Sequence, residues 1–109
     1  FITKSMKDVM CLYEMGIPAI SPSSESTFIP NDILESLKKR FKRIIILFDR
    51  DLAGVRYSRK ISLKMGLEAC FIPKYLNAKD VSDAIKLNNF EIVKKEIEKI
   101  VNKQYKHAL

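Results

Sequence analysis

Two aspartates separated by one residue, Asp49 and Asp51, directly follow the apolar run at residues 44–48. Five consecutive apolar residues, three of them β-branched, are typical of a strand buried on both faces of a parallel sheet. Ligands of such sheets bind at the carboxyl ends of the strands. Close carboxylates repel each other unless a cation compensates, and Mg²⁺ takes one or two carboxylates together with substrate phosphates. The pattern therefore predicts a Mg²⁺ or Mn²⁺ site that contains both aspartates. The alternative is that Asp49 caps a helix and Asp51 decorates its first turn.

Two further aspartates are expected at the same edge of the sheet. Asp80 follows the last predicted strand, in a loop that emerges beside Asp49, and we expect it to complete the metal cluster. Asp8 lies within the first two turns of the first predicted helix, and we expect it to be a ligand as well. Each residue also has a simpler interpretation. Asp80 is a good helix N-cap, a role compatible with metal binding, and Asp8 is a first-turn acid favoured by the helix dipole.

Short apolar runs alternate with longer stretches of helical periodicity along the 109 residues. Strands that alternate with helices imply βαβ units. The predicted fold class is therefore α/β, with a mostly parallel four-stranded sheet flanked by helices. Gly54 and Ser58, one helical turn apart, would let the helix after Asp51 approach the sheet closely. The expected strands are 1–3, 18–21, 43–48 and 68–72, and the expected helices are 5–15, 31–41, 51–65, 81–87 and 90–103.

The three acidic segments, in this order, resemble the Toprim domain of primases, topoisomerases and some nucleases. In that family the first strand ends in Glu-Gly-x-x-Asp, whose Asp matches Asp8. A middle strand ends in Asp-x-Asp, matched by Asp49 and Asp51, and a later loop adds an acid, matched by Asp80. The resemblance covers residues 1–87 and implies a Toprim-like, Rossmann-like fold. It also implies that the carboxylates hold divalent metals that position a nucleoside triphosphate, with Asp49 and Asp51 as catalytic residues.

One position departs from the family pattern, because Lys4 stands where the family has its catalytic Glu, and Ser5 stands where it has Gly. A protonated lysine cannot be a ligand of Mg²⁺. Either the domain is catalytically degenerate and only binds nucleic acid or nucleotides, or another acid serves while Lys4 contacts phosphate. Glu25 is the candidate acid, since its loop follows the second predicted strand; the alternative for Glu25 is a solvated loop residue.

The chain is basic, with 20 Lys and Arg against 13 Asp and Glu and a net charge of +7. A basic excess suits a polyanionic partner such as a DNA template or nucleoside triphosphates, although many lysine-rich proteins bind nothing charged. Arg50, between the two aspartates, is a candidate phosphate contact. Most other basic residues are expected to form a solvated helix surface.

These observations favour a Toprim domain from a DNA primase of bacterial or phage type, which makes RNA primers by metal-dependent nucleotidyl transfer. The alternatives are a degenerate Toprim module that binds nucleic acid or a replicative helicase, and a Toprim nuclease. A phosphatase of the haloacid-dehalogenase type is disfavoured, because Leu52 follows the motif and the motif does not open the chain. Residues 1–87 are expected to form the domain, and residues 88–109 a helix that packs on it and leads to the next domain.

The location expected for this chain is the cytoplasm. Cys11 and Cys70 lie in apolar runs and form no metal-binding pattern, so free thiols in a reducing compartment are expected. The sequence contains no apolar run long enough for a membrane span. Because the first residue is Phe1 and an apolar stretch begins there, we expect the chain to be a fragment of a larger protein.

Overall fold

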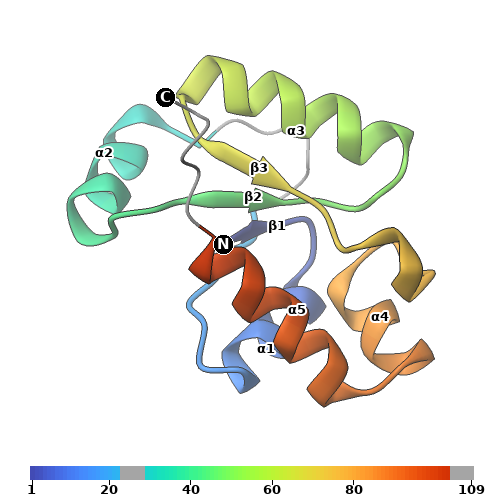
Figure 1. Cartoon of the computed structure of the whole chain (residues 1–109). Coiled ribbons are helices and arrows are strands. Elements are labelled where there is room, and N and C mark those ends of the chain that lie inside the picture. The colour runs from blue at the N-terminus through green and yellow to red at the C-terminus, as the bar shows by residue number, and fades with distance from the viewer. Residues whose placement is uncertain (23–28, 104–109) are drawn as a thin grey trace.

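The computed structural model describes residues 1–22 and 29–103. Its sheet contains three parallel strands in the order β1 (Ile2–Thr3), β2 (Ile45–Leu47) and β3 (Glu68–Cys70) (Figure 1). Ile46 of the central strand is aligned with Ile2 on one side and Ala69 on the other. The predicted α/β class and the parallel sheet are therefore confirmed.

The fourth strand expected at residues 18–21 is reduced to a single parallel bridge between Ile2 and Ile20. Backbone bonds of 2.9 Å join Ile20 to Phe1 and Thr3. Pro18 and Pro22 flank this bridge, and proline has no N–H group to donate to a strand ladder. The described residues therefore form a three-stranded sheet with a short bridged segment at one edge.

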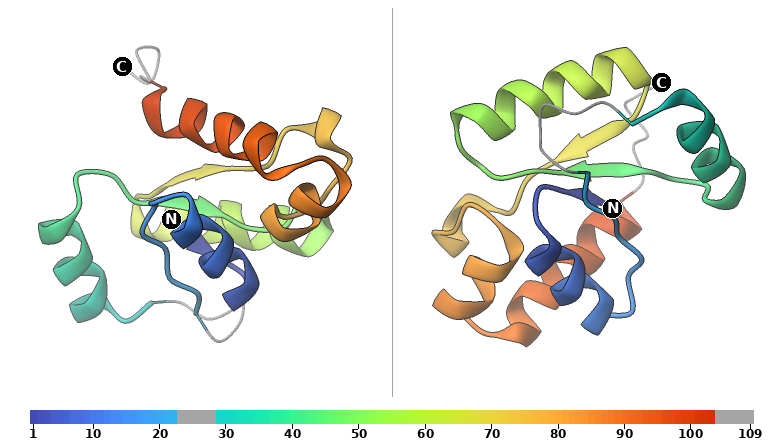
Figure 2. Two further views of the ribbon diagram at one scale, coloured as in Figure 1. Left: turned by 90° about the horizontal axis from the view of Figure 1, so that it is seen from below. Right: turned by 180° about the vertical axis from the view of Figure 1, so that it is seen from behind.

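The helices cover both faces of the sheet, as Figures 1 and 2 show. Helix α3 lies on one face, and α1, α4 and α5 lie on the other. Helix α2 lies toward one end of the sheet, on the same side as α3. A 3₁₀ turn, Lys74–Leu76, follows β3. The helices are α1 (Met6–Glu14), α2 (Asn31–Arg40), α3 (Leu52–Met65), α4 (Val81–Leu87) and α5 (Phe90–Asn102).

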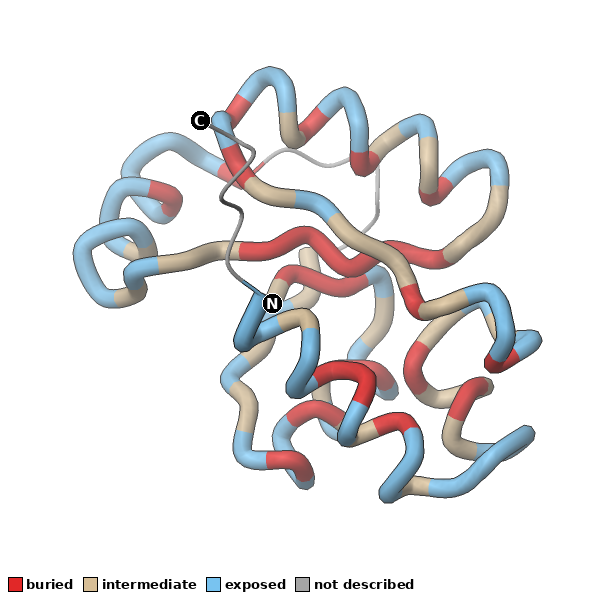
Figure 3. Tube along the Cα trace, in the orientation of Figure 1, coloured by how far each residue is buried: buried red, intermediate tan, exposed pale blue. Residues whose placement is uncertain are grey.

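Strand β2 is buried on both faces because successive side chains of a strand point to opposite sides. Ile46 and Phe48 join the apolar cluster under α2 and α3, whereas Leu47 joins the cluster formed with α1, α4 and α5. All three side chains are almost completely buried (Figure 3). The apolar run that precedes Asp49 is thus the centre of the core, which holds the backbone of Asp49 in a fixed place.

Helix α5 contributes Val93 and Ile97, both fully buried, to the cluster shared with α1 and α4. It therefore packs on the same core as the preceding elements. Cys11 and Cys70 are free thiols and are half-buried. None of the helices in the described ranges has the length and apolar content needed to cross a bilayer.

Candidate metal centre

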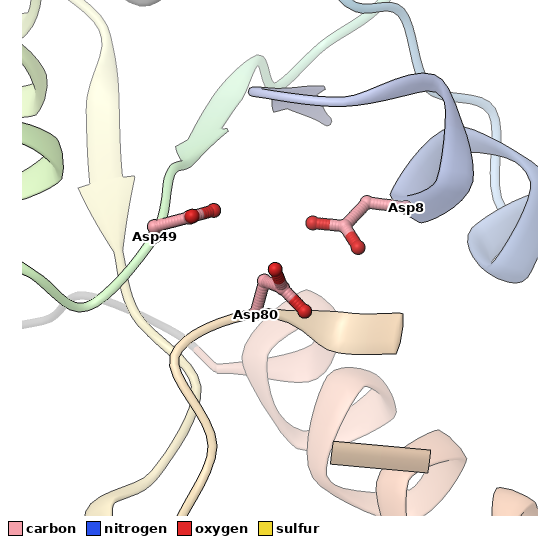
Figure 4. Close-up of side chains that lie close together, drawn as sticks. All are labelled: Asp8, Asp49 and Asp80. Atoms are coloured by element: carbon pink, nitrogen blue, oxygen red, sulfur yellow. The ribbon is translucent and has the colours of Figure 1, made fainter. Parts of the chain in front are cut away.

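Three carboxylates converge at the carboxyl end of the sheet. Asp8 comes from α1, Asp49 follows β2, and Asp80 precedes α4. Each supplies one oxygen atom such that the three oxygens lie within 4.8 Å of one another. Figure 4 shows the three side chains pointing toward a common point. We refer to Asp8, Asp49 and Asp80 as the acidic cluster.

Asp8 is held in place by the start of two helices. Ser5 caps α1, and its hydroxyl accepts the backbone N–H of Asp8 at 3.4 Å. The Asp8 carboxylate in turn accepts the backbone N–H of Ser82 at 3.0 Å. This bond links the first turn of α1 to the first turn of α4. Ser82 was not recognised from the sequence; the signal was its place two residues after a capping aspartate.

Asp80 is the helix cap that its sequence context suggested, and it also lies in the acidic cluster. Its Oδ1 atom accepts the backbone N–H of Asp83 at 2.8 Å and the hydroxyl of Ser82 at 3.1 Å, which makes Asp80 the N-cap of α4. The same side chain contributes an oxygen to the acidic cluster. The cap fixes the orientation of the carboxylate, so the cluster does not depend on a freely rotating side chain.

Arg50 connects the turn after β2 to the loop that carries Asp80. Its backbone N–H donates to the carbonyl of Lys79 at 2.7 Å, and its Nε donates to the carbonyl of Ile72 at 2.8 Å. The guanidinium also lies 5.7 Å from the centre of the Phe71 ring. These contacts anchor both ends of the loop between β3 and α4, so they fix Asp49 and Asp80 relative to each other.

Asp51 lies outside the acidic cluster. It is the N-cap of α3, and its Oδ1 accepts the backbone N–H of Gly54 at 2.7 Å. Both aspartates were predicted to be metal ligands, but the structure brings only Asp49 into the cluster. The helix cap, which the alternative interpretation assigned to Asp49, is Asp51. A Cβ on Gly54 would lie 1.9 Å from the backbone oxygen of Asp49, so the predicted close approach of α3 to the sheet is confirmed. Ser58, one turn further on, is also buried.

Burial and the charges of neighbouring acids disfavour the charged forms of Asp8 and Asp49. Burial raises the pKa of Asp8 to about 6; the N–H of Ser82 opposes the rise, and the charges of Asp80 and Asp49 add to it. Burial also raises the pKa of Asp49, opposed by the charge of Lys4. Carboxylates crowded in this way are stabilised in the charged form when a cation lies among them.

The donor set fits a hard divalent cation. All three donors are carboxylate oxygens, which suit Mg²⁺, Mn²⁺ and Ca²⁺, whereas thiolate and imidazole donors would favour zinc. Asp8 and Asp49 are 1% and 2% exposed, so their oxygens have little access to water that would compete with an ion. The residues present are thus suitable ligands, and the geometry does not select one ion over another.

Lys4 is a basic residue that pairs with a member of the acidic cluster. Its ammonium lies 3.4 Å from Oδ2 of Asp49, and its side chain is 43% exposed while that of Asp49 is 3% exposed. Glu25, the acid considered as a substitute for the missing glutamate, lies outside the described residues.

The chain is an α/β domain whose clustered aspartates, at the carboxyl end of a parallel sheet, could hold a metal ion. The family model described as Toprim-like matches residues 1–85, which is most of the chain. The chain therefore belongs to the Toprim-like family, whose domains bind divalent metals and act in nucleic-acid metabolism. No curated protein and no solved structure matches the chain significantly.

Proposed function

We propose that this domain performs metal-dependent nucleotidyl transfer in a DNA primase, with a DNA template and nucleoside triphosphates as substrates. The observation that carries the proposal is the convergence of Asp8, Asp49 and Asp80 in a Toprim-like domain. A bound Mg²⁺ or Mn²⁺ would neutralise and orient phosphate oxygens. The net charge of +7 supports a polyanionic partner. We further propose a cytoplasmic location and a replicative helicase as an additional partner.

In this proposal the residues of the chain have separate tasks. The acidic cluster holds the ion, while Asp51 holds the start of α3 against the turn that carries Asp49. Lys4 is exposed enough for its ammonium to reach a phosphate while its stem stays beside the cluster. Arg50 uses its Nε on a backbone carbonyl, so we propose that it orders the site, and that any contact with phosphate involves its remaining N–H groups.

The test measures binding of a nucleoside triphosphate to the purified chain, with and without Mn²⁺, by isothermal titration calorimetry. Binding is expected only with Mn²⁺, and Asp49→Asn and Asp80→Asn are each expected to abolish it. Asp83→Asn is the control. Asp83 lies in the first turn of α4, the helix that Asp80 caps, but it is not a member of the acidic cluster. Binding without Mn²⁺, or equal binding by the cluster variants, would refute the proposal.

The second candidate is a degenerate module that binds nucleic acid without catalysis. The ion pair between Lys4 and Asp49 favours it, because an ammonium on a ligand oxygen competes with a cation. The variant Lys4→Glu separates the candidates when primer synthesis on single-stranded DNA is measured. Increased synthesis supports degeneracy, and decreased synthesis supports a positive role for Lys4. Cleavage of labelled DNA or RNA in the same reactions would instead identify a nuclease.

A further inference from the structure

The position of Lys4 is set by contacts on both sides of it. The preceding residue, Thr3, belongs to β1 and its N–H donates to Ile20. The following residue, Ser5, is the N-cap of α1. The carbonyl of Lys4 itself accepts the hydroxyl of Ser21 at 2.9 Å. The backbone of Lys4 is therefore ordered at the end of β1, directly beside the acidic cluster.

The side chain of Lys4 reaches from this position to a different part of the chain. Its ammonium pairs with Asp49 across a separation of 45 residues, at 3.4 Å. Asp49 is nearly inaccessible to water, so its carboxylate depends on this ammonium for charge compensation in the absence of an ion. Lys4 is thus a cation built into the cluster, attached to the chain through a flexible stem.

The net negative charge of the acidic cluster and Lys4 is too small to neutralise two divalent ions. Three carboxylates and one ammonium leave two negative charges, which one divalent ion neutralises. A second divalent ion would have to bind beside the ammonium on Asp49 and leave an excess of positive charge. Like charges this close in a partly buried site disfavour each other strongly.

We propose that Lys4 takes the place of a second cation, so that the acidic cluster binds a single divalent ion. This inference rests on the proposed metal-binding function and specifies the stoichiometry of that site. Lys4 then determines how many ions bind and how tightly. It is a specificity-determining residue and not a ligand, and its ammonium is the second positive charge presented to a substrate phosphate.

The test is a titration of the whole chain with Mn²⁺ alone, in which calorimetry gives the stoichiometry and electron paramagnetic resonance counts free Mn²⁺. The wild type is expected to bind one ion. In Lys4→Met, which keeps the length of the stem and removes the charge, the affinity is expected to rise about tenfold or more. In Lys4→Glu, which adds a fourth carboxylate, two ions are expected.

The control variant is Lys7→Met, which removes one lysine charge from an exposed position in the first turn of α1, three residues after Lys4. Lys7 is not among the groups that shift the pKa of Asp8 or Asp49, so its removal is expected to leave the Mn²⁺ affinity unchanged. Far-ultraviolet circular dichroism establishes that each variant is folded. If Lys4→Glu does not fold, the affinity of Lys4→Met decides the question.

The outcomes separate this inference from the function on which it rests. An unchanged or weaker affinity in Lys4→Met, or two ions in the wild type, would overturn the inference and leave metal binding intact. Binding by the Lys4 variants with none by the wild type would overturn the single-ion stoichiometry and would also contradict the proposed activity. Absence of binding in every variant would overturn both.

Discussion

The close approach of α3 to the turn after β2 makes Gly54→Ala the most informative perturbation of this domain. The new Cβ would lie 1.9 Å from the Asp49 carbonyl oxygen and 2.8 Å from its carbon, whereas real Cβ atoms essentially never come within 3.0 Å. The helix and the turn would have to separate by about 1.1 Å, and both are backbone, so no side-chain rotation relieves the contact.

Two effects of opposite sign act on the free energy of unfolding. Alanine is favoured over glycine within a helix by about 1 kcal/mol. Overpacking costs about 1–3 kcal/mol, and a backbone clash in a buried site belongs at the upper end of that range. We therefore expect Gly54→Ala to lower the free energy of unfolding by about 2 kcal/mol, and the melting temperature by about 10 °C.

Urea denaturation followed by circular dichroism measures this change. Ala53→Gly is the matched control: Ala53 is exposed in the same helical turn, so its replacement is expected to cost only about 0.5–1 kcal/mol. Because Gly54→Ala displaces Asp49, the affinity of this variant for Mn²⁺ should also be lower than that of the wild type. A variant as stable as the wild type, or more stable, would mean that helix propensity decides the outcome and that α3 does not press on Asp49.

Three further predictions concern single side chains. Because the pKa of Asp8 is raised from 3.8 to about 6, the folded metal-free protein holds this proton more tightly than the unfolded chain. Stability is therefore expected to fall as the pH rises from about 4 to 6, by about 3 kcal/mol, and thermal denaturation in EDTA should show a smaller slope in Asp8→Asn, in which the raised pKa of Asp49 remains. The buried hydroxyl of Ser58 makes no hydrogen bond within the described residues, so Ser58→Ala is expected to raise the free energy of unfolding by about 1 kcal/mol in urea. Arg50→Met should lower it by about 1.5–3 kcal/mol, since the carbonyl of Ile72 loses a charged donor; unchanged stability would contradict the anchoring role of Arg50.

The sequence was sufficient to predict a parallel sheet, although with one strand too many, and the convergence of the clustered acids. The apolar run before Asp49 is long enough to require burial on both faces, and that requirement implies a parallel sheet. Once the sheet is parallel, acids that follow separate strands must meet at one edge, as Asp8, Asp49 and Asp80 do. The periodicities also located the helices, with boundaries that agree to within one residue.

The roles of the individual acids could not be predicted from the sequence in the same way. Asp49 and Asp51 have the same residue type and nearly the same sequence context, so their roles depend on where the strand ends and the helix begins. The bond from the Arg50 N–H to the Lys79 carbonyl is part of that turn, and it joins two segments with no sequence signal for pairing. The ion pair between Lys4 and Asp49 likewise depends on the tertiary structure.

The acidic cluster draws its members from three segments that are far apart along the chain. No fragment that ends before Asp80 contains all of its ligands, and each ligand is oriented by a helix start or a strand end that exists only after the chain has collapsed. An ion held by all three acids therefore has no equivalent partner in the unfolded or nascent polypeptide. Its binding would report completion of folding, and its presence would slow the opening of the whole domain rather than of one loop.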